Sequence, residues 1–383
     1  MALPLAPALP RHRAPSAVTV SAAAIAANTA LLREHCRTPL MAVVKADGFG
    51  LGAEAVARAA LAGGASELGV ATCDEALALR TAGISAPILV WMLHAGAPLG
   101  EAIRDDITLS CASVRMLELV VAAAEEAGIR ARVELEVETG MHRSGCAVAD
   151  WGALCAAARK AEHDGHVQVV GVWTHFGGTD DDPAVFAEPL ARLESAWSAA
   201  HGAGLRPRRR HAASSLAAVV SPAARLDLVR VGAALFGIEP VPSRGLGLAT
   251  AARWETTVVQ VRDVAAGEAV GYGQQYRTAR AGRLALLPVG YADGVPRSAW
   301  PGVTVSVNGL RHPLVGAVSM DQCVVDVGGS DVEVGDRVVL VGDAGLGEPS
   351  LREWSLILGT IPQEVLTGLG SRVARVVGQE AEA

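Results

Sequence analysis

The hydrophobic pattern of the chain changes once, near residue 248. Between residues 40 and 232, short apolar runs rich in β-branched residues alternate with alanine-rich segments of helical periodicity. This alternation is typical of βαβ units around a parallel sheet. The runs predicted to be strands cover residues 41–45, 68–72, 88–91, 107–110, 132–137, 168–174, 209–213 and 228–231. Helices are predicted between them, for example over 53–62, 73–82 and 148–163, where strong helix formers end near a glycine.

Eight βα units within roughly 200 residues predict an α/β fold with a (β/α)8 TIM-type barrel, and an open doubly wound sheet is the alternative. After residue 248, short valine-rich runs separated by Gly, Asp and Pro replace the helical pattern, at 256–261, 283–288, 304–307 and 337–341. They predict a second, mainly β domain, interrupted by a helix over 351–358. We therefore expect a barrel domain over 1–248, beginning with a disordered tail over 1–14, and a mainly β domain over 249–383.

Composition and charge narrow the possible partners. The chain has 383 residues, of which 51% are apolar and 19% charged, and its net charge is −7. Such a chain can bury a large core and is expected to be soluble. Nucleic acids and anionic membranes attract positive surfaces, so neither is an expected partner. The basic cluster Arg206, Arg208, Arg209 and Arg210 contains no aromatic residue that could stack on bases, and we interpret it as a solvated turn.

The sequence predicts no membrane span, signal peptide, zinc site or disulfide framework. No run approaches the roughly 18 apolar residues that a membrane span needs. The apolar stretch at the N-terminus precedes its basic residues, which is the reverse of a signal peptide. The six cysteines form no CxxC or CxxH pair, which predicts neither a zinc site nor a disulfide framework. We therefore expect a cytoplasmic protein without a metal site.

Two side chains at predicted strand ends could carry chemistry. Lys45, one of only two lysines, ends the first predicted barrel strand, on the rim where barrels place catalytic groups. A partly desolvated lysine has a lowered pKa and readily forms imines, although a lysine at a strand end can also simply extend its amine into solvent. His175 follows the sixth strand and precedes two glycines that would let the backbone approach a ligand. The alternative for His175 is a purely structural histidine.

The last two predicted strands end in HAASS and VRVGAALFG, where barrels commonly bind phosphate. Ser214 and Ser215 could instead be caps of the following helix. Arg230 keeps its proton, so at a buried strand end it must face an acceptor, either in a ligand or in a nearby acid such as Asp227. An imine-forming lysine, a histidine, an arginine and a phosphate cradle on one rim suggest pyridoxal phosphate, with phosphosugar chemistry as the rival.

Longer motifs reveal a resemblance. AVVKADGFGLG, TGMHRSG, THF, VRVGAALFG, GYGQQYRT, VGYADG, VGAVSMDQ and GTIPQEV follow one another along the chain. Together they resemble, in the same order, the sequence blocks of the fold-type III, pyridoxal-phosphate-dependent alanine racemases. The resemblance implies an isomerase that interconverts L-alanine and D-alanine with pyridoxal 5'-phosphate as cofactor.

The resemblance implies a two-base mechanism. Lys45 is similar to the lysine that holds the cofactor covalently and is one acid/base group. Tyr272 is similar to the tyrosine that supplies the other, from the second domain of the partner subunit. Racemisation needs a proton to leave one face of the α-carbon and another to arrive at the opposite face. The resemblance therefore implies a homodimer whose active sites are shared between subunits.

Other positions of this sequence match cofactor contacts of the family. Arg230 would donate a hydrogen bond to the pyridine nitrogen, with His211 behind it. His175 would lie beside the cofactor ring and lower the pKa of Tyr272, since an unperturbed tyrosine with a pKa of about 10 is a poor base at neutral pH. The residues matching the phosphate contacts are Ser215 and Gly232.

Substrate contacts are implied in the same way. Arg143 matches the arginine that receives the substrate carboxylate. Met320, from the partner subunit, matches a residue that shapes the pocket, and Tyr291 matches a tyrosine near the entrance. Glu136 stands where many members have a carbamylated lysine that braces the substrate arginine, and a plain carboxylate there could brace Arg143 directly.

Two further positions depart from the family. Phe49 replaces a tyrosine whose hydroxyl binds the cofactor phosphate, so one hydrogen bond of about 0.5–1.5 kcal/mol is expected to be missing. Gln363 replaces a tyrosine between the phosphate and the entrance, and loss of that ring could admit a substrate larger than alanine. A racemase of serine or a larger amino acid is therefore an alternative.

A protein with this barrel could also have a role other than racemisation. A non-catalytic pyridoxal-phosphate carrier would have no use for Tyr272 in a second domain. A related decarboxylase is expected to carry a cysteine-bearing specificity region, which Cys323 alone does not supply.

Overall fold

The computed structural model describes residues 14–178 and 181–378, and these fall into two compact units. One unit spans residues 22–249 and the other contains residues 250–378 together with the strand that precedes residue 22. All but the last residue of the expected tail over 1–14 lies outside the described residues.

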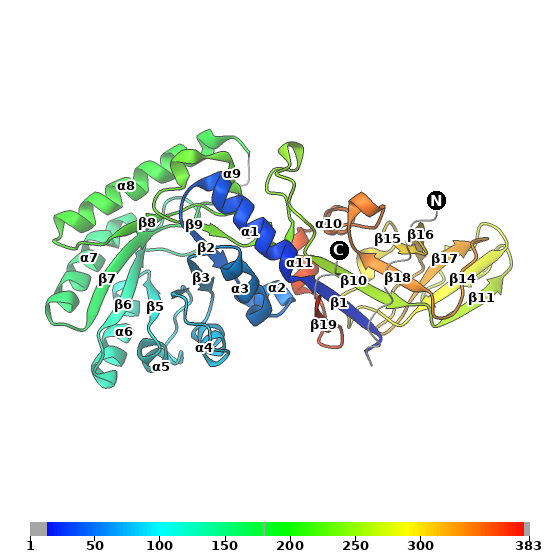
Figure 1. Cartoon of the computed structure of the whole chain (residues 1–383), viewed down its shortest axis with the longest axis horizontal. Coiled ribbons are helices and arrows are strands. Elements are labelled where there is room, and N and C mark those ends of the chain that lie inside the picture. Colours follow the sequence, from blue (N-terminus) through cyan, green and yellow to red (C-terminus); the bar gives the residue numbers. More distant parts are fainter. Residues whose placement is uncertain (1–13, 179–180, 379–383) are drawn as a thin grey trace. The chain divides into compact units, whose positions relative to one another are not determined.

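The first unit is a barrel of parallel strands (Figure 1). Its strands are β2 (Leu40–Val43), β3 (Glu67–Val70), β4 (Ile88–Val90), β5 (Ile107–Cys111), β6 (Ala131–Glu136), β7 (Val167–Trp173), β8 (Arg209–His211) and β9 (Val229–Val231). Neighbours in sequence pair in order from β2 to β8, and β9 pairs with β2. A single bridge between His211 and Leu228 joins β8 to the start of β9 and closes the sheet. The predicted barrel is confirmed, and the open doubly wound sheet is wrong.

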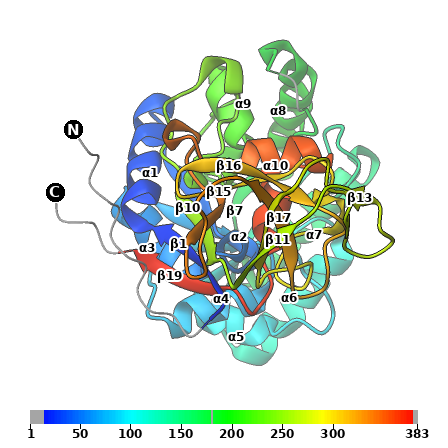
Figure 2. The same cartoon turned by 90° about the vertical axis from the view of Figure 1, so that its right-hand side faces the viewer.

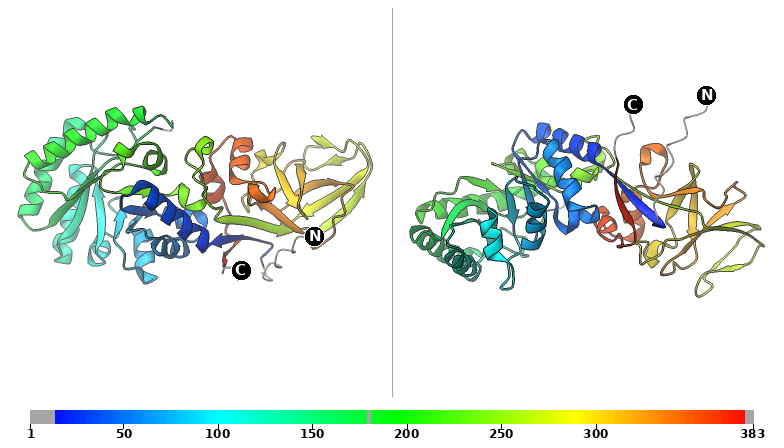
Figure 3. Two further views of the ribbon diagram at one scale, coloured as in Figure 1. Left: turned by 45° about the horizontal axis from the view of Figure 1, so that its top comes forward. Right: turned by 60° about the horizontal axis from the view of Figure 1, so that its bottom comes forward.

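Helices surround the barrel strands, as Figure 3 shows. They are α1 (Ala22–Cys36), α2 (Lys45–Gly50), α3 (Ala53–Ala62), α4 (Cys73–Thr81), α5 (Leu99–Arg104), α6 (Val114–Ala127), α7 (Val148–His163), α8 (Ala187–Gly202) and α9 (Ser215–Val220). Short 3-10 turns lie at Pro183–Phe186, Pro222–Ala224, Ala233–Phe236 and Pro242–Arg244.

Local capping explains where several of these helices begin and end. Helix α4 starts in a capping box, in which the Thr72 hydroxyl accepts from the Glu75 amide and the Glu75 carboxylate accepts in return. Helix α6 starts at Ser113, whose hydroxyl accepts from the Met116 amide, and ends at Gly128 in the left-handed conformation. Met41, Leu89 and Leu228 pack together between the strands. Capped helices and an apolar interior give the rim a rigid base.

The second unit is built on one mixed sheet with the strand order β11-β14-β17-β16-β15-β18-β10-β1-β19. Its strands are β1 (Ser16–Ser21), β10 (Ala252–Thr257), β11 (Gln260–Val264), β14 (Gly282–Leu287), β15 (Thr304–Val307), β16 (Leu310–Val315), β17 (Cys323–Gly328), β18 (Arg337–Val341) and β19 (Ala374–Gly378). A small hairpin, β12 (Ala269–Val270) with β13 (Tyr276–Arg277), and helices α10 (Leu351–Leu358) and α11 (Pro362–Thr367) complete it. Shorter 3-10 turns lie at Arg297–Ala299 and Ala344–Leu346.

Two details of this unit differ from the sequence-based expectation. Strand β1 pairs antiparallel with β10 and parallel with β19, so residues 16–21 belong to the β sheet and not to the barrel (Figure 2). The run over 256–261 is not one strand, because the chain leaves β10 at Val258 and starts β11 at Gln260. The Val258 amide donates to Asp336 and the Val259 amide to Leu286, so successive residues bond to different neighbouring strands.

Candidate active site

The barrel rim gathers the side chains predicted for catalysis and cofactor binding. Lys45 follows β2, His175 follows β7, His211 ends β8 and Arg230 lies in β9. Because parallel strands of a barrel end at the same rim, these residues share one face of the unit. His211 is fully buried and Arg230 is 5% exposed, so the polar groups lie inside the barrel mouth.

Lys45 has the environment of a reactive amine. Its side chain is half-buried, and its Nζ lies 5.8 Å from the centroid of the Trp91 ring. Burial lowers the pKa of Lys45, the charge of Arg143 lowers it further, and Glu75 opposes both. A larger share of neutral amine at neutral pH favours nucleophilic attack and proton abstraction.

The segment labelled α2 is not a right-handed helix, because the backbone directly after Lys45 forms a left-handed turn. Ala46, Asp47, Gly48 and Phe49 have φ angles of 52°, 52°, 61° and 59°. L-residues avoid this conformation at a cost of about 1–2 kcal/mol each, so three non-glycine residues in it store strain. The turn is absent from the sequence-based prediction, which continued the strand through Lys45.

Backbone amides that donate to two carboxylates hold this turn in place. Glu75 Oε1 accepts from the Ala46 amide at 2.7 Å, while its Oε2 accepts from the Ala71 amide at 2.7 Å. Asp47 Oδ1 accepts from the Ala53 amide at 2.8 Å. The carboxylate of the α4 capping box therefore also fixes the residue next to Lys45.

Arg230 is fixed by four acceptors. Its NH1 donates to His211 Nδ1 at 2.8 Å, and its NH2 donates to His175 Nδ1 at 3.0 Å. The carbonyl oxygens of Thr174 and Ala212 also accept from NH2, at 2.9 and 3.0 Å, so the two NH2 hydrogens are shared among three acceptors. Burial lowers the pKa of Arg230 to about 10, which still leaves the guanidinium charged at neutral pH. Asp227, the acid considered from the sequence, does not fill this role.

Both histidines around Arg230 are neutral. A guanidinium can only donate, so each Nδ1 must accept and each neutral ring carries its proton on Nε2. Burial, reinforced by the charges of Arg230, Arg143 and Lys45, lowers the pKa of His175 to about 3. Burial also lowers the pKa of His211 to about 4. The rim therefore presents one permanent cation held by two uncharged imidazoles.

The segment predicted to bind phosphate brings Ser215, Gly232 and Phe49 together. Ser215 Oγ accepts from the Gly232 amide at 3.2 Å, whereas Ser214 occupies the N-cap position of α9 without a side-chain capping bond. A Cβ added to Gly232 would lie 3.0 Å from Phe49 Cζ, the carbon that would carry a tyrosine hydroxyl. The Phe49 ring packs on Phe236 with centroids 4.9 Å apart. A glycine is therefore needed for this close approach.

Arg143 and Glu136 do not form the predicted direct contact. Glu136 is buried, and its Oε1 accepts from Ser144 Oγ at 2.6 Å. Arg143 is exposed and makes no hydrogen bond or ion pair with any residue in the described part of the chain. The neighbouring Ser144 hydroxyl donates to the Glu136 carboxylate. Glu136 therefore acts on Arg143 only through the attraction of their charges. The charge of Arg143 also lowers the pKa of Lys45.

Three predicted residues lie in the second unit on adjoining loops. The backbone of Tyr272 forms a bridge with Ala317, and the Tyr291 amide donates to the Ser319 carbonyl at 3.0 Å. The Ala292 amide donates to the Met320 carbonyl at 3.0 Å. The side chains of Tyr272, Tyr291 and Met320 are 69%, 41% and 52% exposed. Each of these adjoining loops therefore presents a large, exposed side chain.

Comparison with known proteins assigns the chain to a family. The model of the alanine racemase N-terminal domain matches residues 20–240, and that of the C-terminal domain matches residues 251–377. The chain belongs to the alanine racemase family. The resemblance inferred from the sequence blocks is thereby confirmed.

Individual relatives support the assignment of this chain to the family. It is 46% identical to the alanine racemase of Salinispora arenicola, over 94% of this chain and 97% of that protein. The alanine racemase of Thermobifida fusca is 45% identical, over 92% and 95%. The crystal structure of alanine racemase from Streptomyces lavendulae has a TM-score of 0.94 at 40% identity and covers 97% and 99% of the two chains. That from Bartonella henselae, described with covalently bound pyridoxal phosphate, has a TM-score of 0.83 at 28% identity, over 95% and 100%.

Two residues beneath the rim of this alanine racemase family member, Glu134 and Arg209, are not predicted as site residues from the sequence. His211 Nε2 lies 2.6 Å from Glu134 Oε2, and Arg209 pairs with Glu134 at 2.5 Å. Arg209 was interpreted as part of a solvated turn, which is wrong because its strand, β8, closes the barrel and turns the side chain toward buried acids. Charged residues at alternate positions of a buried strand, Glu134 and Glu136, were the available signal.

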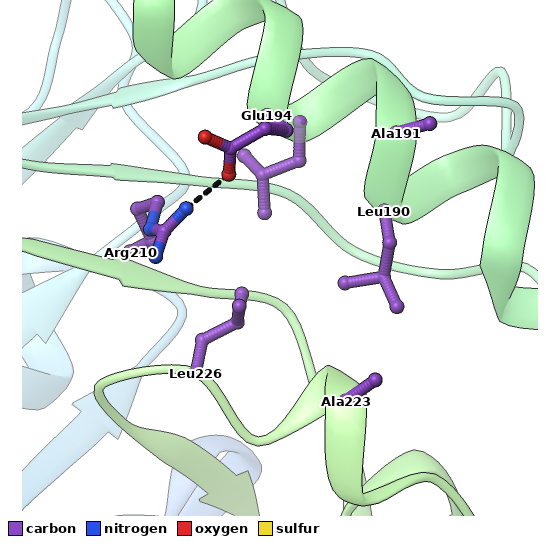
Figure 4. A pocket seen from close by; sticks show the side chains of 7 residues that line it. Leu190, Ala191, Glu194, Arg210, Ala223 and Leu226 are labelled. Atoms are coloured by element: carbon purple, nitrogen blue, oxygen red, sulfur yellow. Dashed lines mark hydrogen bonds and ion pairs between the residues drawn. The ribbon is translucent and has the colours of Figure 1, made fainter.

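One pocket of the family member contains none of the predicted site residues. A pocket outside the barrel is lined by Leu190, Ala191, Leu193, Glu194, Arg210, Ala223 and Leu226, and an Arg210–Glu194 ion pair crosses one side of it (Figure 4). Among residues 14–178 and 181–378, no three His, Cys, Asp or Glu side chains are grouped to hold a metal. Within the same ranges, no helix is long and apolar enough to span a membrane.

Proposed function

We propose that the protein is a pyridoxal-phosphate-dependent racemase that interconverts L-alanine and D-alanine. The observation that carries the proposal is the arrangement on the barrel rim, where an amine with a lowered pKa stands on the same face as a buried arginine held by two neutral histidines. Relatives named alanine racemase at 45–46% identity support alanine as the substrate and give no support to serine.

The residues present fit pyridoxal phosphate. Lys45 would hold it covalently, and Ser215 with the backbone at Gly232 would hold the phosphate. Gly232 fits this use because a Cβ there would close the space beside Phe49. His175 would lie beside the ring and Arg230 would donate to the ring nitrogen. The cofactor supplies an electron sink that makes the α-hydrogen of an attached amino acid acidic.

The chain's own groups move the protons. Lys45 Nζ accepts or delivers the α-proton on one face, helped by a pKa that burial holds below the usual value. Tyr272 Oη of the partner subunit acts on the opposite face. Arg143, which has no partner among the described residues, receives the substrate carboxylate, and Met320 and Tyr291 shape the entrance.

Arg230 would control the charge of the ring nitrogen. With a pKa of about 10, it keeps its proton at neutral pH and acts only as a donor. Toward a bound cofactor it would therefore donate a hydrogen bond to the ring nitrogen without giving up its proton, which would limit delocalisation into the ring and suppress transamination. The neutral His175 can accept from Arg230 without adding a second positive charge.

Exposed side chains of the second unit support a homodimer with shared sites. Tyr272, Met320 and Tyr291 present exposed large side chains on loops joined by backbone hydrogen bonds. In a single chain, the 69% exposed Tyr272 has no reacting group to act on. On a dimer face, it can enter the partner's barrel rim. These exposed side chains support the assembly.

The proposal is tested by incubating the cofactor-loaded protein with L-alanine in heavy water. Chiral separation and mass analysis are expected to find D-alanine with deuterium at the α-carbon, because the second proton comes from a solvent-exchanged group. Loaded protein that neither inverts nor exchanges alanine would refute the proposal, and a panel of other L-amino acids would then identify the substrate.

Phe49→Tyr is expected to tighten cofactor binding. The new hydroxyl would extend from Cζ, the ring carbon nearest to Gly232, and supply the missing hydrogen bond to the phosphate. One such bond corresponds to roughly a 2- to 10-fold lower dissociation constant. Absorbance titration of cofactor-free protein measures the change, and equal unfolding temperatures of the two cofactor-free proteins provide the control. Unchanged or weaker binding would mean that the phosphate is held elsewhere.

A further inference from the structure

A buried carboxylate faces the histidine behind Arg230. Glu134, on β6, is completely buried, and its Oε2 lies 2.6 Å from Nε2 of His211 on β8. The strand between them, β7, carries Gly171, where an added Cβ would lie 2.8 Å from Glu134 Cδ. Only a glycine leaves room for this carboxyl group, so its position is fixed by packing.

The carboxylate is ionised although it is buried. Burial raises the pKa of Glu134, but the hydrogen bonds and charges of His211 and Arg209 outweigh burial and hold the pKa at about 2. Arg209 Nε donates to Glu134 Oε1 at 2.7 Å, and Arg209 NH1 donates to Glu67 Oε1 at 2.5 Å. Each oxygen of Glu134 thus has its own donor.

In the hydrogen-bonded row Arg230–His211–Glu134, the two outer residues determine which nitrogen of His211 carries the proton. Arg230 can only donate, so Nδ1 of His211 must accept. The proton of the neutral His211 ring is therefore on Nε2 and is donated to Glu134. If that proton were on Nδ1, two donors would face each other at Arg230 and the Nε2 lone pair would face a carboxylate.

We propose that Glu134 is a positioning residue for the reaction: by accepting the Nε2 proton of His211, it selects the tautomer whose Nδ1 holds Arg230 in place. The inference deepens the proposed function and rests on it for the role of Arg230 at the cofactor ring. His211 transmits the effect, and neither Glu134 nor Arg209 contacts the reacting atoms.

An amide cannot replace this carboxylate. Arg209 and His211 bond to different oxygens of Glu134, so in Glu134→Gln the single amide oxygen can accept from one of them but not from both. If the oxygen stays with Arg209, the amide NH2 faces Nε2 of His211 and favours the Nδ1–H tautomer, which breaks the bond to Arg230. If the amide turns over, two donors meet at Arg209, and a buried donor is left without a partner.

The experiment compares cofactor-loaded wild type, Glu134→Gln and Glu67→Gln, all labelled with 15N-histidine. The ring nitrogen shifts of His211, assigned by their loss in His211→Asn, report the tautomer directly. We expect Nε2–H in the wild type and in Glu67→Gln, because Glu67 contacts only Arg209 in this line. We expect a shift toward Nδ1–H in Glu134→Gln, with kcat lowered roughly tenfold and KM for alanine changed less than about twofold.

Two results would overturn the proposal. One is a folded Glu134→Gln protein that keeps Nε2–H on His211 and a wild-type kcat. The other is a wild-type spectrum with Nδ1–H on His211, which decides the matter even if Glu134→Gln does not fold. The spectrum needs no turnover, so a protein with the expected tautomer but no racemisation would refute the proposed function and leave the role of Glu134 at His211 standing.

Discussion

Lys45→Ala is expected to abolish covalent attachment of the cofactor and to lower racemisation by about a thousandfold or more. The substitution removes both the amine that would form the bond and one of the two acid/base groups. No second amine can replace it, because the chain's other lysine, Lys160, lies on the outer helix α7 and pairs with Asp164. Borohydride reduction followed by peptide mass analysis measures attachment, and a chiral assay measures the rate.

Lys160→Ala is the matched control for this prediction. Its side chain is 79% exposed, and its ion pair with Asp164 lies on one helix surface, so its loss is expected to leave attachment and rate unchanged. A reduced cofactor adduct at Lys160, or undiminished racemisation by Lys45→Ala, would contradict the assignment of Lys45.

Tyr272→Phe is expected to lower racemisation by roughly 10²- to 10⁴-fold while leaving the other proton-transfer group intact. The phenol is the only group assigned to its face of the α-carbon, whereas Lys45 still serves the opposite face. In heavy water, one enantiomer of alanine should therefore continue to exchange its α-hydrogen without inversion. Mass analysis of each enantiomer, starting from pure L- or pure D-alanine, measures this asymmetry.

Tyr276→Phe controls for the loss of a phenol nearby in the same unit. The Tyr276 hydroxyl donates to Asp326 at 2.9 Å, a bond from the β12–β13 hairpin to strand β17, so its removal should affect stability modestly and leave both exchange rates equal. Equal loss of exchange for both enantiomers in Tyr272→Phe would show that the tyrosine is not confined to one face.

The barrel was predictable because its evidence is local in the sequence. Each strand is a short apolar run, and several of the following helices carry their own start or stop signals. Strand β1 was not predictable in the same way, because its partners β10 and β19 lie more than 200 residues away in the chain. Only long-range pairing decides which sheet such a strand joins.

The candidate site was predictable in part. Strand ends indicated Lys45, His175 and Arg230, since a barrel places such positions on one rim. The left-handed turn after Lys45 could not be foreseen, because Ala46 and Phe49 have no preference for that conformation and tertiary hydrogen bonds impose it.

Two other residues show why the remainder of the site escaped prediction. Glu134 escaped notice because an acid in a strand normally faces solvent, and only closure of the barrel turns it inward. Tyr272 stood out only through the family resemblance, since an exposed tyrosine in one chain gives no physical hint of a partner subunit.

Closure of the barrel also links chemistry to folding. Strands β8 and β9 meet through one backbone bridge, so this seam has the fewest paired residues in the barrel wall. The bond between His211 and Arg230 crosses it, as does the bond from the Arg230 amide to the Ala213 carbonyl. Side chains that would orient the cofactor therefore also hold β8 and β9 together. Faster amide hydrogen exchange along β9 would therefore report local separation of β8 and β9 before the whole protein unfolds.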